Sequence, residues 1–133
     1  MISFLFVFNN WALLLARVVL GLILVKHGLP KIKDLKKTGK DFAGMGFKPG
    51  YFWGVVVALL EVVGGIFIMA GFLTQLIAIL VAIQFFILLL TIKRSSKFGD
   101  IEFDLIILAT AFVIATTGAG SYSIDSFFNL FLY

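Results

Sequence analysis

The chain has 133 residues, of which 62% are hydrophobic, and its mean hydropathy is +1.14; soluble globular chains are only about 45–50% apolar. The absence of cysteine excludes disulfides, thiol catalysis, iron–sulfur ligation and the usual zinc sites, and a single histidine, His27, excludes bis-histidine haem ligation within one chain. The net charge of +4 comes from lysines grouped between apolar segments, which indicates membrane topology or an anionic lipid surface rather than nucleic-acid binding.

Four apolar segments predict membrane-spanning helices. A bilayer core about 30 Å thick needs roughly 20 apolar residues in a helix, and the four segments lie at about 11–27, 52–72, 73–92 and 103–118. Helices are expected because lipid offers backbone groups no other partner. No basic region or small-residue cleavage site accompanies the first segment, so we expect it to stay in the mature protein. The predicted fold is all-α: one integral membrane domain over residues 1–133, a four-helix bundle with antiparallel neighbours.

The first two connections differ in kind. The first is long, polar and rich in lysine, and Pro30 is expected to end the first helix. Residues 32–42 are then expected to form a short amphipathic helix that lies along the membrane interface. The second connection, Gly71–Thr74, is so short that the helices it joins must be antiparallel neighbours.

Basic residues predict the orientation of the bundle. The first and third connections carry lysine or arginine, whereas the second connection and both chain ends carry none. Because basic loops remain on the cytoplasmic side, we expect a multi-pass protein of the cell (inner, cytoplasmic) membrane with both termini outside the cytoplasm.

A cluster of small and polar residues follows the fourth segment. Gly118 is expected to end that helix in the left-handed conformation. Ser123 and Asp125 then resemble cap or turn residues at the outer edge of the bundle. They precede an apolar tail, residues 127–133, that is expected to dock on the membrane surface.

Three polar side chains interrupt the apolar segments. An ionisable group at membrane depth costs at least ~2.5 kcal/mol and is a functional candidate by default. Arg17 and Glu61 both lie near the middle of their segments, so the simplest expectation is that they pair, with Gln84 as the strongly polar group of the third segment. Two interpretations stay equally open: an ion pair that sets the register of two helices, or a pocket that binds a ligand head group or passes a proton.

Small residues at helical spacing predict which faces point inward. Three- and four-residue intervals place these residues on single helix faces, and glycine or alanine there lets helices approach closely. The faces are Arg17, Gly21, Leu24 and Gly28; Glu61, Gly64, Gly65 and Ile68; Ala78 and Ala82; and Asp104, Leu108, Ala111, Ala115 and Gly118.

A second polar cluster is expected at the cytoplasmic edge. It contains His27 and Lys31 at the end of the first helix, with Glu102 and Asp104 at the start of the fourth. Helix capping and snorkelling lysines explain most of this pattern. Metal binding by His27, Glu102 and Asp104 is the weaker interpretation, and we expect no metal site.

These features together resemble the DoxX family of small membrane proteins, over nearly the whole chain. The pieces that carry the resemblance, in order, are Arg17-x-x-x-Gly21, Gly28-x-x-Lys31, Gly46-Phe47-x-Pro49, Glu61-x-x-Gly64-Gly65, Gly71-x-x-Thr74, Glu102, and Gly118-x-Gly120-x-x-Ser123-Ile124-Asp125. One departure is the third connection, where many members carry a histidine and this chain has Lys93-Arg94-Ser95-Ser96. Any role of that histidine therefore does not transfer.

The resemblance implies a four-helix membrane bundle and a set of functional polar positions. Those positions are Arg17, Lys31, Glu61, Glu102 and Asp125. Some family members are associated with quinone-linked oxidation of sulfur compounds or with oxidant-defence complexes at the membrane. The resemblance supports the architecture more strongly than it supports a reaction.

Three functions are compatible with these residues. The first is an accessory or quinone-docking subunit of a membrane oxidoreductase, in which Arg17, Gln84 or Lys31 donates to the quinone and Glu61 accepts a proton. No flavin, haem or metal motif is present, so a redox partner protein would supply the electrons, and an enzymatic activity of the chain's own is not predicted. The alternatives are a membrane scaffold and, third, a small transporter of a neutral or anionic solute. The small-residue faces are compatible with a homo-oligomer but do not require one.

Overall fold

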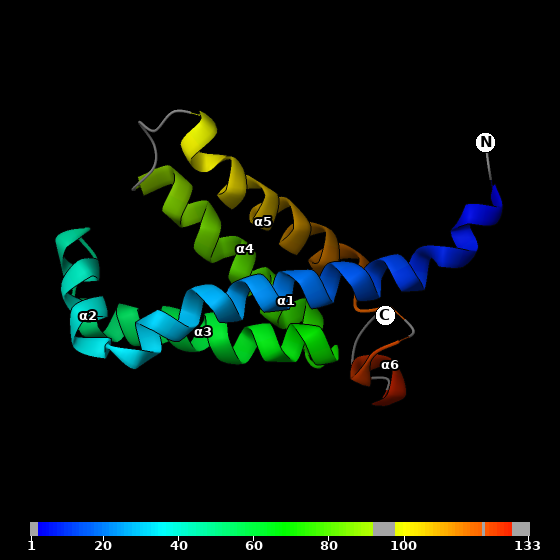
Figure 1. Ribbon diagram of the computed structural model, residues 1–133, viewed down its shortest axis with the longest axis horizontal. Helices are drawn as coiled ribbons and strands as arrows, with labels where there is room; N and C mark the ends of the chain where they lie inside the picture. Colours follow the sequence, from blue (N-terminus) through cyan, green and yellow to red (C-terminus); the bar gives the residue numbers. More distant parts are fainter. Residues whose placement is uncertain (1–2, 92–97, 121, 129–133) are drawn as a thin grey trace.

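The computed structural model describes residues 3–91, 98–120 and 122–128, and within these ranges every regular element is a helix. The elements are a 3-10 helix η1 (Ser3–Phe8) followed by α1 (Asn9–Lys33), α2 (Leu35–Gly44), α3 (Gly50–Ala70), α4 (Thr74–Thr91), α5 (Phe98–Thr117) and α6 (Ile124–Phe128) (Figure 1). The all-α class is thereby confirmed for the described chain. The basic residues 93, 94 and 97 of the third connection and the tail residues 129–133 lie outside it.

The helices form two antiparallel pairs, α1 with α3 and α4 with α5. The pairs come together near the short α3–α4 turn and spread apart toward the end where α2 lies (Figure 1). Gly71 ends α3 in the left-handed conformation with φ 76°, and Gly118, at φ 84°, does the same after α5. A core formed by all four helices holds the pairs together; it contains Leu20, Leu24, Ile68, Ala78, Val81, Phe85, Ile107, Ala111 and Ile114.

Glycines set the close approach of α1 and α3. A Cβ added at Gly21 would lie 2.5 Å from the Gly65 carbonyl oxygen, and one at Gly65 would lie 2.8 Å from the Gly21 carbonyl oxygen. Both positions therefore require the absence of a side chain. The predicted inward faces of these two helices are confirmed, because Arg17, Gly21, Leu24 and Gly28 and also Glu61, Gly64, Gly65 and Ile68 are buried.

Replacing Gly21 by alanine is expected to destabilise the protein by about 1–3 kcal/mol, because the new methyl group meets backbone that cannot move aside alone. Gly44→Ala is the matched control: a Cβ there has no neighbour within 4 Å. The measurement is thermal unfolding of the three proteins in one detergent. Equal unfolding temperatures for Gly21→Ala and Gly44→Ala would contradict the close approach.

The short helix expected at residues 32–42 is present as α2, at 35–44, and it packs on α3. Thr38 and Gly39 are buried against the first turns of α3: a Cβ on Gly39 would lie 3.0 Å from the Tyr51 Cα, and one on Gly54 would lie 3.0 Å from the Thr38 Cγ2. In Figure 1, α2 lies across the beginning of α3. The start of α3 is therefore covered by α2, and α1 is displaced along α3 toward the α3–α4 turn.

The first helix does not end at Pro30, which is a correction. Pro30 lies inside α1, and the helix continues to Lys33. Proline removes one backbone hydrogen bond, but its fixed φ is itself helical. Gly28 packs against Glu61 and Val62 of α3, and the Thr38 hydroxyl donates to the Lys31 carbonyl at 3.0 Å. These contacts hold the last turns of α1 against α3 and α2.

Large apolar side chains cover the outside of the molecule. Every long helix exposes several of them, among which are Leu15, Leu22, Ile66, Ile83, Ile106 and Phe112, each at least half exposed. By length and composition, α1 and α3 could each cross a membrane, and Thr74–Leu90 is a shorter apolar helix. Monomeric soluble proteins rarely expose apolar surface on this scale.

Candidate functional site

Arg17 ties three chain segments together at the end where α3 meets α4. Its fully buried guanidinium donates to the Ile68 and Met69 carbonyls at 3.2 Å each, and also to the Tyr122 carbonyl. The last carbonyls of a helix have no partner within the helix, so Arg17 supplies donors to the end of α3. It also holds the segment that follows α5.

The expected pairing of Arg17 with Glu61 is wrong. The Gly28 position of α1, not Arg17, lies beside Glu61: a Cβ on Gly28 would be 2.8 Å from the Glu61 Cβ. Arg17 is eleven residues earlier, about 16 Å along the helix axis. The prediction assumed that residues equally far from the ends of their helices lie side by side. In the structure, the docking of α2 on α3 sets the register of α1 on α3, and Arg17 does not reach Glu61.

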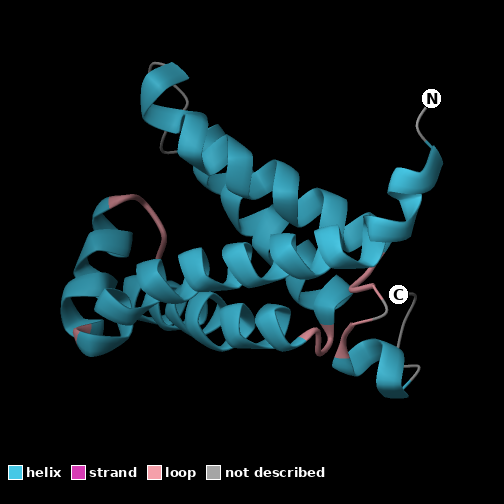
Figure 2. Cartoon of the chain, turned by 45° about the vertical axis from the view of Figure 1, so that its right-hand side comes forward, coloured by secondary structure: helices cyan, strands magenta, loops and turns pink. Residues whose placement is uncertain are grey.

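Asp125 caps a helix distant in the sequence. Its carboxylate accepts hydrogen bonds from the Leu73 amide at 2.7 Å and the Thr74 amide at 2.9 Å, which are the first free donors of α4. Its own amide donates to the Gly71 carbonyl at 2.8 Å. The Ser123 hydroxyl donates to the Gly120 carbonyl at 2.7 Å, and Ser123 also packs against Gly71. Asp125 and Arg17 together join the chain after α5 to the α3–α4 turn, and Figure 2 shows the backbone of these two regions close together.

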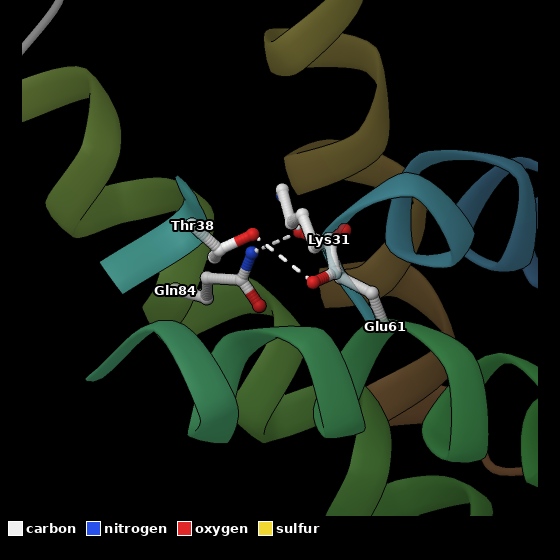
Figure 3. Close-up of polar contacts among 4 residues, drawn as sticks. All are labelled: Lys31, Thr38, Glu61 and Gln84. Carbon is white, nitrogen blue, oxygen red and sulfur yellow. Dashed lines mark hydrogen bonds and ion pairs between the residues drawn. The ribbon is translucent and has the colours of Figure 1, made fainter. Parts of the chain in front are cut away.

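A second polar group lies farther from the α3–α4 turn, near the middle of α3 and α4 and the end of α1. The Lys31 ammonium donates to Glu61 Oε1 at 2.7 Å, and the Gln84 amide donates to the same oxygen at 2.8 Å (Figure 3). Glu61 is only 1% exposed, whereas about a third of the Lys31 side chain is exposed. The partner of Glu61 is therefore Lys31, with Gln84 as a second donor.

Two buried oxygens of this group have no hydrogen-bond partner among the described residues. They are Glu61 Oε2 and Gln84 Oε1. Leaving a buried acceptor unsatisfied costs about 1–3 kcal/mol, and more for a charged group. Orphaned oxygens of this kind require either a bound ligand or an explanation.

A cavity of about 810 Å³ opens beside these residues, between the two helix pairs. Its polar wall is formed by His27, Lys31, Glu61, Gln84 and Asp104. Aromatic and aliphatic side chains from α2, α3, α4 and α5 and from the α2–α3 connection form the rest. An apolar cavity with a few convergent polar groups is typical of small-molecule sites.

The expected cytoplasmic-edge cluster is only partly brought together. Lys31, His27 and Asp104 all line the cavity, and the His27 ring lies 5.5 Å from the Phe103 ring. Glu102 is exposed and does not line it. In the described part of the chain, no group of three or more His, Cys, Asp or Glu residues could hold a metal ion.

Sequence reasoning missed the aromatic wall of the cavity. Phe42, Phe47 and Trp53 come from α2, the α2–α3 connection and the start of α3. The sequence signals were an amphipathic helix and an interfacial tryptophan. Neither signal indicates a cavity until α2 is known to pack on α3.

Comparisons with known proteins support a family assignment. A family model described as DoxX matches residues 12–94. The chain is 32% identical over 115 residues to the protein named "Putative oxidoreductase CatD" of Bacillus subtilis (strain 168), covering 86% of this chain and 84% of that protein. It is 34% identical over 122 residues to "Inner membrane protein YqjF" of Escherichia coli (strain K12), covering 87% and 91%. No solved structure matches.

Proposed function

The chain belongs to the DoxX family, and from this membership we propose an integral, multi-pass membrane protein in which α1, α3, α4 and α5 form a transmembrane four-helix bundle. The exposed apolar side chains on all four helices support this, because they would face lipid rather than water. One relative is named an inner membrane protein. This supports the cell membrane as the location.

The proposed orientation places both termini outside the cytoplasm. Exposed lysines gather at the α2 end of the molecule, at positions 33, 36, 37 and 40. The described residues at the opposite end carry no exposed lysine or arginine. Because lysine and arginine are retained on the cytoplasmic side, the α2 end would face the cytoplasm.

We propose further that the protein is an accessory or quinone-docking subunit of a membrane-associated oxidoreductase. The observation that carries this proposal is the unpartnered Glu61 Oε2 at the polar wall of a large, otherwise apolar cavity. A quinone needs both features: polar groups for its ring oxygens and an apolar space for its tail. The name of the Bacillus relative also refers to an oxidoreductase.

The residues fit this ligand class. A bound quinone supplies reversible chemistry of two electrons and two protons, and the sequence contains no flavin, haem or metal motif, so a partner protein would supply the electrons. Lys31 Nζ would donate to a ring oxygen, and Glu61 would hold or release a proton at Oε2. Aromatic side chains such as Trp53 and Phe103 would pack on the ring and exclude water. Arg17, bound to carbonyls at the other end, has no part in this site.

A scaffold function is the second candidate, and the Arg17 contacts favour it. In these contacts a buried charge joins chain segments. If Lys31 and Glu61 have the same role, the polar residues would only hold together a scaffold that binds partner proteins.

Quinone is expected to co-purify with the protein extracted in mild detergent, and mass spectrometry and absorbance detect it. Gln84→Leu is expected to lower the bound quinone about fivefold, because it removes the second N–H of the Gln84 amide, which would donate to a ring oxygen, and one hydrogen bond is worth ~1 kcal/mol. Gln75→Leu is the matched control: Gln75 is also on α4, and its amide donates to the Ala115 carbonyl at 3.0 Å, but it does not line the cavity. No quinone in any sample, even after adding excess, would reject this proposal in favour of the scaffold.

A further inference from the structure

The polar wall of the cavity contains two buried oxygens that receive no hydrogen bond from the described residues. Lys31 Nζ lies 2.7 Å from Glu61 Oε1, and a carboxylate that is paired with an ammonium accepts hydrogen bonds without donating one. Oε1 receives one hydrogen bond from Lys31 and one from Gln84, and Oε2 receives none. A ligand that completes this wall must donate to Oε2.

Gln84 adds a second free acceptor. Its amide nitrogen must face Glu61, because an amide oxygen at 2.8 Å from a carboxylate oxygen would be repelled. This orientation leaves the Gln84 carbonyl oxygen buried and without a partner. Lys31 has three N–H groups, and only one of them is used by Glu61. Beside these two free acceptors, the wall contains the remaining N–H groups of the Lys31 ammonium, the second N–H of the Gln84 amide, and the side chains of His27 and Asp104.

We propose that this cavity binds the reduced, dihydroxy form of its ligand, a quinol, in preference to the corresponding quinone. The proposal rests on the quinone-docking function above and adds the redox state that the site selects. A quinol hydroxyl donates to Glu61 Oε2 while its oxygen accepts from Lys31 Nζ, so one group satisfies both. A quinone carbonyl only accepts; it satisfies Lys31, leaves Oε2 unpaired and places its own partial negative charge near the carboxylate.

This preference has a consequence for the direction of electron transfer. Reduction of the quinone takes two electrons from the redox group of the partner protein and two protons, and it yields the quinol. Tighter binding of the product favours that reduction by the same factor, because binding and reduction are linked equilibria. A tenfold preference raises the potential of the bound couple by about 30 mV. The site would thus favour the reaction in which electrons from a partner protein reduce quinone to quinol.

Trp53 provides the readout for a test, since it lines the cavity, whereas the second tryptophan, Trp11, lies 4.7 Å from the Tyr122 ring at the other end. Trp11→Phe protein in lipid nanodiscs is titrated without oxygen with a decyl-tailed benzoquinone and with its quinol. The dimethyl ether of the quinol, which has no donor, is tested as a competitor. Trp53→Phe protein, which retains Trp11, measures quenching by ligand dissolved in the lipid.

The quinol is expected to bind about tenfold more tightly than the quinone, which corresponds to ~1.4 kcal/mol, and the ether is expected not to compete. In Glu61→Gln protein, where the side chain offers a donor of its own, the difference is expected to fall below about twofold. Equal or tighter binding of the quinone by wild type would overturn the preference and leave the docking function standing. Failure of both ligands to quench Trp53 above the lipid background would remove the docking function itself. The comparison of quinol with quinone binding is made on protein that retains Glu61. The test of the preference therefore stands even if the Glu61→Gln protein does not fold.

Discussion

Arg17→Ala protein is expected to lose about 3–5 kcal/mol of stability, because the substitution removes the charged donor of three carbonyls on two segments, and a hydrogen bond to a charged group contributes about 1.5–3 kcal/mol. Those acceptors are on Ile68, Met69 and Tyr122. Arg17→Lys is expected to recover only part of the loss, since one compact ammonium cannot reproduce the fork geometry of a guanidinium. The measurement is unfolding in one detergent by denaturant or heat, followed by circular dichroism.

The control for Arg17 is an exposed cation on the same helix. Lys33→Ala removes a positive charge from the last turn of α1, where Lys33 is exposed, and is expected to change stability by less than about 0.5 kcal/mol. If Arg17→Ala protein unfolded like the Lys33→Ala protein but lost its bound quinone, Arg17 would belong to the ligand site after all.

Lys31→Met is the second substitution with a large expected effect. It leaves the Glu61 carboxylate 1% exposed with only the Gln84 amide as partner, and breaking one side of a buried ion pair costs about 3–5 kcal/mol. The double variant Lys31→Met/Glu61→Gln is expected to regain most of this loss, because it also removes the charge. Unfolding of the wild type, both single variants and the double variant forms a double-mutant cycle.

Strong coupling between the two sites is therefore the expected result of that cycle. Lys36→Met serves as the control for losing a lysine, since Lys36 is exposed on α2. Additive effects of Lys31→Met and Glu61→Gln would show that the pair contributes nothing as a pair, and would contradict the ionised Glu61 on which the quinol preference depends.

Glu61 shows how far sequence reasoning reached. A carboxylate between leucines and valines in a 21-residue apolar helix is visible as a buried polar group from the sequence alone. The glycines at positions 64 and 65 also indicated that its face is packed. The identity of its partner was not visible, because Arg17 and Lys31 are both cations on one face of the same helix.

For Asp125, too, the sequence predicted the local role of the residue but not its distant partner. Its place after two glycines, in a polar segment, indicated a turn. Its carboxylate instead accepts from Leu73 and Thr74, more than fifty residues earlier. Patterns among neighbouring residues contain no information about such a contact, because it depends on the packing of α5, which brings the chain after it back to the α3–α4 turn.

The sequence by itself determined the all-α class, the approximate extent of the long helices, their buried faces and the polar residues within them. Each of these follows from hydropathy and helical period, which act over neighbouring residues. Only the tertiary structure decided that Lys31 rather than Arg17 pairs with Glu61, that Arg17 and Asp125 join the chain after α5 to the α3–α4 turn, and that a cavity lies between the helix pairs. The contacts after α5 depend on where that helix ends, and the pairing of Glu61 depends on the register of α1 on α3. That register is set by steric contact, through the docking of α2 on the first turns of α3 and the glycine contacts of Gly21 and Gly65.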